Sequence, residues 1–198
     1  MLNYQQQEKR DTMASVGIIA EYNPFHNGHL YHLKKTRENG ATHIVAVMSG
    51  NYVQRGDTAV MDKFERAKLA VKGGADLVIE IPTVYALSSA EFYAKGAIYI
   101  LDSLGCVDEI SFGSEAGSVS ELEKAAEIAD ECSGAPELEE YLKSGMSYPN
   151  AINTMIYSSY GKKLSNRISD ILASPNNVLA VEYLKALRRL NSSITPFT

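Results

Sequence analysis

The sequence VGIIAEYNPFHNGHLYHLKKTRE, residues 16–38, decides the fold of this chain. Its first seven residues are mostly apolar and lead into Asn23-Pro24, a pattern that predicts a buried strand followed by a turn. Residues 27–38 place apolar side chains among lysines and arginines at helical spacing, and an Asn-Gly pair follows them, which predicts a helix and its end. A strand that passes into a helix through a short turn is the first half of a strand–helix–strand unit.

The same alternation continues to residue 131. Further strands are predicted at residues 43–48, 77–81 and 109–112, and further helices at residues 62–72, 88–104 and 118–131. The last of these helices contains Ser120-x-x-Glu123, the pattern of a capping box. Alternation of this kind predicts an α/β fold with a parallel sheet that helices cover on both faces. Ligands are expected beyond the carboxyl ends of the strands, near a switch in strand order.

The strand pattern stops after residue 134, and a helical C-terminal part is predicted. Helices are expected at residues 136–143, 149–160 and 176–190, with a polar connector at residues 161–175. We therefore divide the chain into a disordered leader (1–15), an α/β domain (16–133) and a helical segment (134–198). The last residues, ITPFT (194–198), are apolar and β-prone with no stop signal, so we expect the helical segment to be truncated.

Composition and length describe an ordinary globular protein. The chain has 198 residues, of which 45% are hydrophobic and 22% are charged, enough for one α/β domain with a helical appendage. No apolar run approaches the roughly 20 residues that span a bilayer. The first fifteen residues have no apolar core of a secretory signal, which predicts a cytoplasmic protein. Cys106 and Cys132 lie far apart, and we expect reduced core residues rather than a disulfide or a metal pair.

The net charge of −5 is unevenly distributed along the chain. Residues 102–140 hold twelve acidic side chains and one lysine, whereas residues 141–198 hold seven basic side chains and two acidic ones. A basic C-terminal third permits a patch that binds nucleic acid, but the alternative is a set of solvated helix faces. On charge alone we favour the solvated faces.

His26 and His29 stand where the first predicted strand gives way to the first predicted helix. The unpaired backbone N–H groups and the dipole of a helix N-terminus favour a bound polyphosphate. The two histidines are three residues apart and share one face of the first turn, so both can donate hydrogen bonds to phosphate oxygens and to a leaving pyrophosphate. Gly28 between them has no side chain, which would let an adenosine lie against the helix.

Two other interpretations of the histidine pair remain open. As a zinc pair it needs a third ligand, and no candidate can be placed. As a pair of helix-capping residues it would have a structural role only. An isolated HxxH is a weak motif, and the strand before it and the helix after it are what favour a nucleotide site.

The sequence GIIAEYNPFHNGHLYHL, residues 17–33, resembles the HxGH signature of nucleotidyltransferases and class I aminoacyl-tRNA synthetases. Its full length is more similar to one family, the bacterial tRNA(Met) cytidine acetate ligases. Further blocks match that family in the same order: MSGNYVQRG (48–56), ADLVIEIP (75–82), FGSE (112–115) and SPNN (174–177). The resemblance extends from residue 16 nearly to the end of the chain, and it implies a Rossmann-like nucleotidyltransferase (HxGH) fold.

The resemblance also implies an activity. Acetate and ATP would react to acetyl-adenylate and pyrophosphate, and the acetyl group would pass to the N4 amine of the wobble cytidine in elongator tRNA(Met), without acetyl-CoA. The expected cofactor is ATP with Mg²⁺, with no tightly bound metal or prosthetic group. In the family the chain continues beyond this point, with a further ATP-contacting arginine and much of the tRNA surface.

The resemblance implies the residues of the ATP site, with His26 and His29 as the catalytic pair. The ATP-binding positions are Ile19, Ala20, Glu21, Tyr22, Asn23, Pro24, Phe25, His26, Asn27, Gly28, His29, Leu30, Tyr31, His32, Gly113 and Asn176. A glycine at the end of a strand also permits close approach of adenine or ribose, although Gly113 could equally be a turn glycine. Asn176 could be a helix N-cap after a proline, which is compatible with binding ATP.

The loop at residues 49–57 supplies further candidates. Gln54 and Arg55 could reach acetate or phosphate, because a guanidinium matches either anion with two hydrogen bonds. On the next helix, Lys63 and Arg66 are expected on a solvated face, with pairing to phosphates as the alternative. Glu80 lies in an apolar strand, so we expect a buried carboxylate with a partner that the sequence does not identify.

Two other functions stay open at this stage. One is a nucleotidyltransferase that adenylates a small phosphorylated metabolite, which would share the HxGH site. The other is a truncated homologue that binds ATP or tRNA without turnover. The extended EYNPFHNGH string and the basic residues favour the tRNA ligase over the metabolite enzyme, and the basic residues concerned are Lys162, Lys163, Arg167, Lys185, Arg188 and Arg189.

Overall fold

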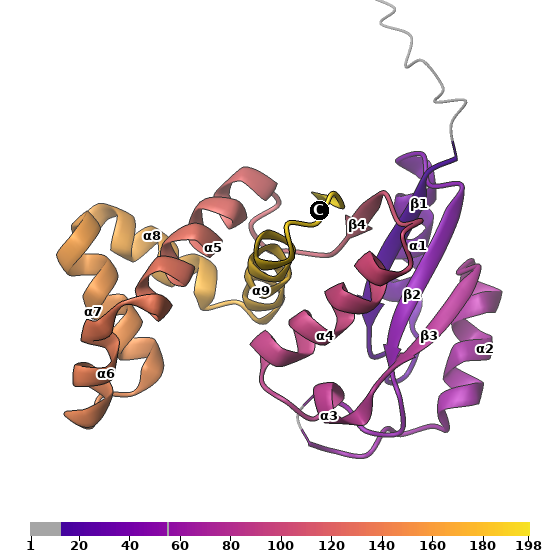
Figure 1. The fold of residues 1–198 in the computed structure, drawn as a ribbon. Coiled ribbons are helices and arrows are strands. Elements are labelled where there is room, and N and C mark those ends of the chain that lie inside the picture. The colour runs from indigo at the N-terminus through magenta and orange to yellow at the C-terminus, as the bar shows by residue number, and fades with distance from the viewer. Residues whose placement is uncertain (1–12, 55) are drawn as a thin grey trace, which may run out of the picture.

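The computed structural model describes residues 13–54 and 56–198 and contains a five-stranded sheet, helices on both of its faces and a lobe of helices at one end (Figure 1). The strands are β1 Ser15–Ala20, β2 His43–Ser49, β3 Leu77–Ile81, β4 Glu109–Ser111 and β5 Thr195–Phe197. The helices are α1 Asn27–Glu38, α2 Lys63–Gly73, α3 Thr83–Ala86, α4 Ala90–Ser103, α5 Val119–Gly134, α6 Pro136–Lys143, α7 Tyr148–Tyr160, α8 Lys162–Leu172 and α9 Pro175–Leu190. Most of the predicted leader, residues 1–12, lies outside the described residues; Ala14 is buried and Ser15 begins β1.

All strand pairs of the sheet are parallel, in the order β3-β2-β1-β4-β5. From β1 the chain first moves outward to β2 and β3 and then returns to the other side of β1 as β4. The switch in strand order therefore lies between β1 and β4, where the crossover helices leave to opposite faces. The predicted α/β fold with a parallel sheet is confirmed.

Period-two alternation along the strands divides the core into two layers. On β2, Ile44, Ala46 and Met48 face the layer under α1 and α2, whereas Val45 and Val47 face the layer under α4 and α9. On β1, Gly17 faces α4, and a Cβ there would lie 2.6 Å from the Leu101 side chain. This glycine allows α4 to pack directly on the sheet.

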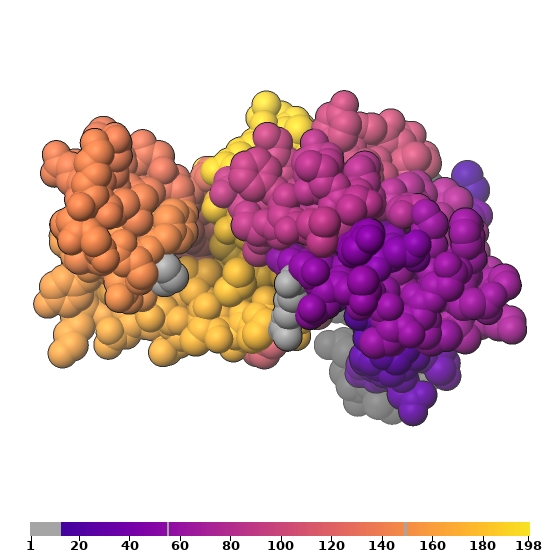
Figure 2. Space-filling view, turned by 90° about the horizontal axis from the view of Figure 1, so that it is seen from below, coloured from indigo at the N-terminus to yellow at the C-terminus, as the bar shows by residue number. Residues whose placement is uncertain are grey.

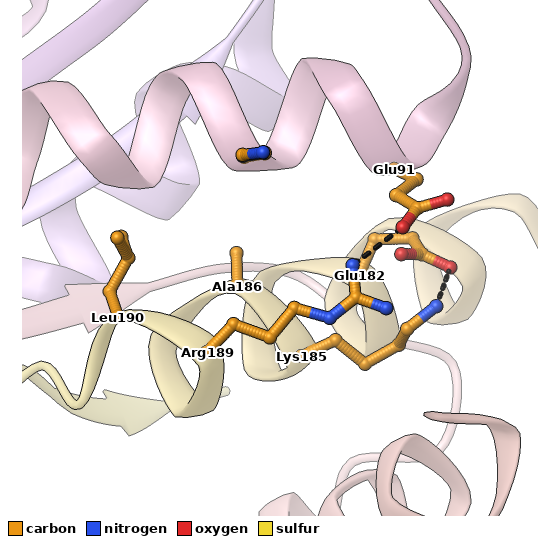
Figure 3. Close-up of a pocket in the computed structure, with 7 residues that line it drawn as sticks. Glu91, Glu182, Lys185, Ala186, Arg189 and Leu190 are labelled. Atoms are coloured by element: carbon orange, nitrogen blue, oxygen red, sulfur yellow. Dashed lines mark hydrogen bonds and ion pairs between the residues drawn. The ribbon is translucent and has the colours of Figure 1, made fainter. Parts of the chain in front are cut away.

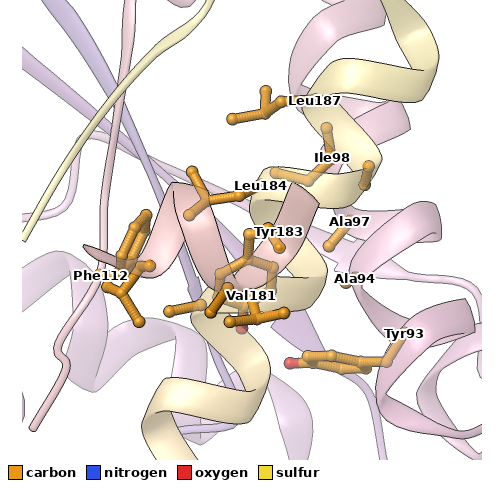
Figure 4. Close-up of a cluster of buried hydrophobic side chains, with 14 of the residues drawn as sticks. Tyr93, Ala94, Ala97, Ile98, Phe112, Val181, Tyr183, Leu184 and Leu187 are labelled. Carbon is orange, nitrogen blue, oxygen red and sulfur yellow. The ribbon is translucent and has the colours of Figure 1, made fainter. Parts of the chain in front are cut away.

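Helix α9 belongs to the α/β core although it comes from the C-terminal part of the chain. In Figure 4, Tyr93, Ala97 and Ile98 of α4 lie against Tyr183 and Leu184 of α9. Strand β5 follows α9 and extends the sheet beyond β4. The residues 195–197 thus add a fifth strand to the sheet, beside β4.

Two local predictions are wrong. Residues 161–175 are not a connector, because α8 covers most of them and, on one face, buries Ile168 and Ile171 and partly buries Leu164. The spacing of these three residues is helical, but the polar residues between them obscured it. The capping box at Ser120 does not form either, since the N-cap of α5 is Ser118 and it makes no side-chain cap.

Helices α6, α7 and α8 form a lobe at one end of the molecule, with α9 between this lobe and the sheet. Seen from below, the lobe (orange) and the sheet domain (indigo to magenta) stand on either side of α9 (Figure 2).

Cys132 is buried, as expected, but Cys106 is exposed, and both are free thiols. Among the described residues, no helix is both long and apolar enough to cross a membrane.

Candidate nucleotide-binding site

The candidate site lies at the switch in strand order, beyond the carboxyl ends of β1 and β4. Ile19 and Ala20 end β1, residues 21–26 form the connecting loop, and residues 27–32 form the first turns of α1. Gly113 lies two residues after the end of β4, the strand that pairs with β1. Both parts of the predicted ATP site therefore lie beyond the carboxyl ends of neighbouring strands.

His26 and His29 cap the first turn of α1 reciprocally. His26 is the N-cap residue, and its Nδ1 accepts the backbone N–H of Gly28 at 3.0 Å. The Nδ1 of His29 accepts the backbone N–H of His26 at 3.2 Å. The two imidazoles stack with centroids 3.7 Å apart and planes 25° from parallel. Both histidines therefore cap α1, and capping fixes how both rings are oriented.

The caps determine which ring nitrogen carries the proton. Each Nδ1 accepts a hydrogen bond from a backbone N–H, so a neutral ring carries its proton on Nε2. Burial, and then the neighbouring His26 and His32, lower the pKa of His29 to about 4. At neutral pH His29 is therefore an uncharged imidazole whose Nε2–H can donate a hydrogen bond.

An aromatic cluster supports the histidine pair from below. The Tyr22 ring, which is buried, lies with its centroid 4.9 Å from that of His29 and 5.1 Å from that of Phe25. Phe25 fits against α2 because a Cβ on Gly73 would lie 2.5 Å from its ring. His29 is thus held by its cap and by its contacts with these aromatic side chains.

Gly28 is required by the histidine pair itself. A Cβ at this position would lie 2.9 Å from Cε1 and 3.1 Å from Nδ1 of His26. Any larger residue must displace the capping ring. This is a reason for the glycine that the sequence did not reveal, and the close approach of an adenosine remains a prediction.

His32, Leu30 and Tyr31 lie further along α1 in different surroundings. His32 Nε2 and Ser111 Oγ of β4 are 2.8 Å apart, and Thr36 Oγ1 donates to the same hydroxyl at 3.1 Å. Burial lowers the pKa of His32. Tyr31 is exposed and Leu30 is partly buried. His32 thus ties α1 to β4 across the switch point.

The second side of the site is the start of α9. The Glu115 carboxylate accepts Asn176 Nδ2 at 2.9 Å and the Asn177 backbone N–H at 3.1 Å. The Asn177 Oδ1 accepts the N–H groups of Glu115 and Ala116 at 2.9 and 3.1 Å. The N-cap of α9 is Ser174, so the interpretation of Asn176 as the cap is wrong.

Sequence reasoning missed Asn177, which is the buried residue of the Asn-Asn pair and joins α9 to the loop after β4. Its only signal was its position next to Asn176. Gly113 is exposed, its φ is not positive, and a Cβ there would meet nothing within 4 Å. Neither the turn nor a neighbouring side chain therefore demands glycine at position 113.

The segment between β2 and α2 contacts the loop that precedes His26. The Gln54 backbone N–H donates to Glu21 Oε1 at 2.9 Å, which brings Gln54 beside the loop that precedes His26. Arg55, the other predicted anion-binding residue, lies outside the described residues. The expectation of a solvated Arg66 is wrong, because its side chain is fully buried.

The expectation of a buried Glu80 is also wrong. Its side chain is 41% exposed and pairs with Lys63 at 2.6 Å. Glu80 lies on β3, which is the edge strand of the sheet, so the apolar pattern of the strand does not imply burial on both faces. The partner that the sequence left unidentified is Lys63.

The zinc interpretation of the histidines finds no support in residues 13–54 and 56–198. No three His, Cys, Asp or Glu side chains are grouped there as metal ligands. The third ligand that a zinc site needs is therefore missing from the described structure.

Several of the basic residues in the C-terminal third are paired with acidic residues of this chain. Arg189 bonds Glu91 at 2.6 Å and Asp130 at 2.7 Å, and Lys185 bonds Glu182 at 3.0 Å. These pairs border a cavity of about 290 Å³ between α4 and α9, away from the histidine pair (Figure 3). Arg167 pairs with Glu121 of α5. Half of the proposed basic set is thus used in internal ion pairs.

Comparison with known proteins places these observations in a family. A model of the HIGH nucleotidyl transferases matches residues 13–198. A tRNA(Met) cytidine acetate ligase of Thermoanaerobacter sp. (strain X514) is 52% identical over 189 residues, which cover 94% of this chain and 46% of the relative. The corresponding ligase of Acetivibrio thermocellus is 48% identical over 194 residues, 94% of this chain and 45% of the relative. The chain spans about half the length of the curated relatives it matches.

A solved structure shows the same fold. The crystal structure of Thermotoga maritima TmcAL bound with alpha-thio ATP matches with a TM-score of 0.83 and 38% sequence identity, over 94% of this chain and 46% of that one. The predicted resemblance to tRNA(Met) cytidine acetate ligases is therefore confirmed in both sequence and fold. Since the family model covers nearly all of the described residues, this chain belongs to the HIGH nucleotidyltransferase family.

Proposed function

We propose that this chain carries the ATP-binding and acetate-activating site of a tRNA(Met) cytidine acetate ligase. The observation that carries the proposal is the reciprocal cap of His26 and His29 at the N-terminus of α1, at the switch point of the sheet. The relatives named as such ligases and the neighbour bound with alpha-thio ATP support it.

ATP would lie across the switch point, with its phosphates at the N-terminus of α1. Backbone N–H groups and the helix dipole favour the phosphates there. The adenosine would extend towards Gly113 and Asn176. This placement is supported by the open space above Gly113, where the fold itself does not demand a glycine.

The proposed reaction has two steps. A carboxylate oxygen of acetate attacks the α-phosphorus of ATP, the bond from that phosphorus to the α,β-bridging oxygen breaks, and pyrophosphate leaves. The cytidine amine then attacks the acyl carbon of acetyl-adenylate, and AMP leaves as the amine loses a proton. Each step needs alignment and stabilisation of oxygen charge more than covalent catalysis.

The histidines would act as hydrogen-bond donors to the phosphates. Their caps orient both rings and place the proton of a neutral ring on Nε2. The low pKa of His29 keeps that ring neutral, so it would stabilise developing charge without transferring a proton. The loss of one such preorganised donor costs roughly 10²–10³ in rate in other enzymes.

We propose that Mg²⁺ arrives with the nucleotide. A Mg²⁺ ion of this kind is held mainly by phosphate oxygens and water. The transfer of acetyl to elongator tRNA(Met), and the cytoplasmic location that tRNA implies, are also proposals. They rest on the names of the relatives and not on the basic residues of the C-terminal third, because Arg167, Lys185 and Arg189 already form ion pairs within the chain.

The test is ATP–pyrophosphate exchange by this chain with magnesium. We expect exchange that depends on acetate and that phosphopantetheine or nicotinamide mononucleotide does not replace. Exchange with one of these metabolites but not with acetate would instead identify a metabolite nucleotidyltransferase. ATP binding without exchange in the presence of any of these acids would identify a binding module.

A further inference from the structure

Arg66 is a fully buried cation at the edge of the sheet where the strands end. Its guanidinium donates to the backbone carbonyl of Glu21 at 2.5 Å, to that of Ser49 at 3.0 Å, and to that of Gly50. Its Nε donates to the carbonyl of Met61 at 3.2 Å. These four hydrogen bonds all go to backbone oxygens, and Glu21, Asp62 and Glu80 supply the nearby negative charge.

The four carbonyls belong to three separate segments. Glu21 is the first residue after β1, Ser49 and Gly50 mark the end of β2, and Met61 directly precedes the N-cap of α2. One planar group with fixed donor directions therefore joins the loop after β1, the end of β2 and the start of α2. A lysine has three donors on one atom and cannot reproduce this geometry.

The segment between β2 and α2 is held against the histidine loop at further points. Val60 N–H donates to Asn23 Oδ1 at 2.8 Å, and Gln54 N–H donates to Glu21 Oε1 at 2.9 Å. Within the segment, Ala59 N–H donates to the Asn51 carbonyl at 2.9 Å. These bonds hold the middle of the segment, whereas Arg66 holds the backbone at its two ends.

We propose that Arg66 is a positioning residue: it fixes the segment between β2 and α2 against residues 21–23, and so sets the wall that receives the acid substrate. The inference rests on the proposed function, because assigning this wall to acetate requires that acetate is the substrate. Arg66 touches neither ATP nor acetate in this account and acts through Glu21 and Gln54.

Arg37 is a matched control for a purely structural role. It also donates to backbone carbonyls, those of Ala41 at 3.3 Å and Gly74 at 2.9 Å among them. It thus joins a helix to the backbone just before two strands. It lies at the opposite edge of the sheet, where β2 and β3 begin. Replacing either arginine by lysine should destabilise the fold, but only Arg66→Lys should affect the acid.

The experiment compares wild type, Arg66→Lys and Arg37→Lys by thermal unfolding, amide hydrogen exchange and ATP–pyrophosphate exchange. In Arg66→Lys we expect the amides of Gln54, Ala59 and Val60 to exchange faster, and the KM for acetate to rise roughly tenfold or more with a smaller change in the KM for ATP. Arg37→Lys should leave both quantities near the wild-type values at a similar loss of Tm.

Equal effects of the two variants on acetate KM, or unchanged exchange of the three amides in Arg66→Lys, would overturn the inference. If Arg66→Lys does not fold, Asn51→Ala decides, since Asn51 Oδ1 accepts the Lys63 N–H at 3.2 Å and holds the same segment to α2. Faster exchange at Val60 with a raised acetate KM supports the inference, and wild-type values refute it. Wild-type chain without acetate-dependent exchange would refute the proposed function, while the amide exchange would still decide whether Arg66 fixes the segment.

Discussion

The Nδ1 of His29 accepts the backbone N–H of His26 at 3.2 Å, while the two imidazole rings stack with centroids 3.7 Å apart. A histidine three residues after the N-cap thus takes the place of the acidic or amide residue usual in a capping box. Because the bond uses Nδ1, the Nε2 of the same ring is left to donate outward. Capping the helix and binding an anion are therefore two functions of one side chain, served by its two nitrogens.

The two nitrogens of His29 can be tested separately. In His29→Asn the side-chain amide can approximate Nδ1 and keep the cap, but the donor at Nε2 is lost. In His29→Gln the amide reaches the Nε2 position, and the cap is weakened. We expect His29→Asn to lower acetate-dependent exchange roughly 10²–10³-fold with little change in Tm. His29→Gln should keep more activity and lose about 0.5–1 kcal/mol of unfolding free energy.

Activity and denaturant unfolding of both variants check this prediction. If His29→Asn were as active as wild type, the Nε2–H would have no part in catalysis. If the two variants were equally active and equally stable, the division of labour between the nitrogens would be wrong.

The low pKa of His29 predicts how stability depends on pH. The folded ring titrates near 4 and the unfolded ring near the ordinary value of 6.5, so between these values the unfolded chain binds more protons. The free energy of unfolding should therefore be highest, as far as His29 is concerned, above pH 6.5, and should fall as the pH drops towards 4. Protonation also places a hydrogen on Nδ1, where the cap needs an acceptor.

Urea unfolding of wild type and His29→Asn at several pH values between 7.5 and 4.5 measures this contribution. The stability of wild type relative to the variant should decrease as the pH falls. Parallel pH profiles of the two proteins would show that His29 does not titrate with a depressed pKa.

Replacing Gly28 by alanine should separate helix propensity from site geometry. Alanine is favoured over glycine within a helix by about 1 kcal/mol. The added Cβ, however, would lie 2.9 Å from Cε1 of His26, so the capping ring must move. We expect activity to fall while the free energy of unfolding changes by less than about 1 kcal/mol in either direction.

Gly134→Ala is the control for this change. Gly134 ends α5, and a Cβ there meets nothing within 4 Å. This variant should keep full activity. Full activity of Gly28→Ala would show that the position of the His26 ring is not critical.

The two neighbouring asparagines at the start of α9 should respond differently to alanine. Asn177 is buried, and its loss leaves the N–H groups of Glu115 and Ala116 without their acceptor, which costs about 1–3 kcal/mol. Asn176 is exposed, and its side-chain amide donates a hydrogen bond to the Glu115 carboxylate. Asn176→Ala should therefore raise the KM for ATP at nearly unchanged stability, whereas Asn177→Ala should mainly lower Tm. The opposite assignment of effects would show that Asn177, and not Asn176, faces the nucleotide.

The fold and the centre of the site were predictable because they depend on local signals. The apolar run before Asn23, the helix after it and the HxGH string are contiguous, and the strand–helix alternation fixes the parallel sheet. The sequence also predicted that Gly113 lies near the carboxyl end of a strand, and the structure places it just after β4. The pattern of β-prone residues at the end of the chain gave no position for them, and pairing with β4 is a long-range contact.

Residues that act through long-range contacts were predicted poorly. In the sequence, Arg66 has the helical spacing of a solvated cation. Its burial is evident only from its hydrogen bonds to the carbonyls of Glu21, after β1, and Ser49, in β2. Glu80 looked buried because the sequence does not show that β3 is an edge strand. Asn177 was indistinguishable from Asn176 until the loop after β4 was placed against both.

Isotope transfer tests the central claim most directly. The chain is incubated with ATP, magnesium and acetate labelled with ¹⁸O in both oxygens, with hydroxylamine in place of the tRNA amine. If an acetate oxygen attacks the α-phosphorus and the amine then attacks the acyl carbon, each AMP formed carries one ¹⁸O and acetohydroxamate appears in equal amount. Labelled AMP with matching hydroxamate is the predicted result. ADP as the nucleotide product, or AMP without the label, would contradict the assignment of this site to acetate adenylation.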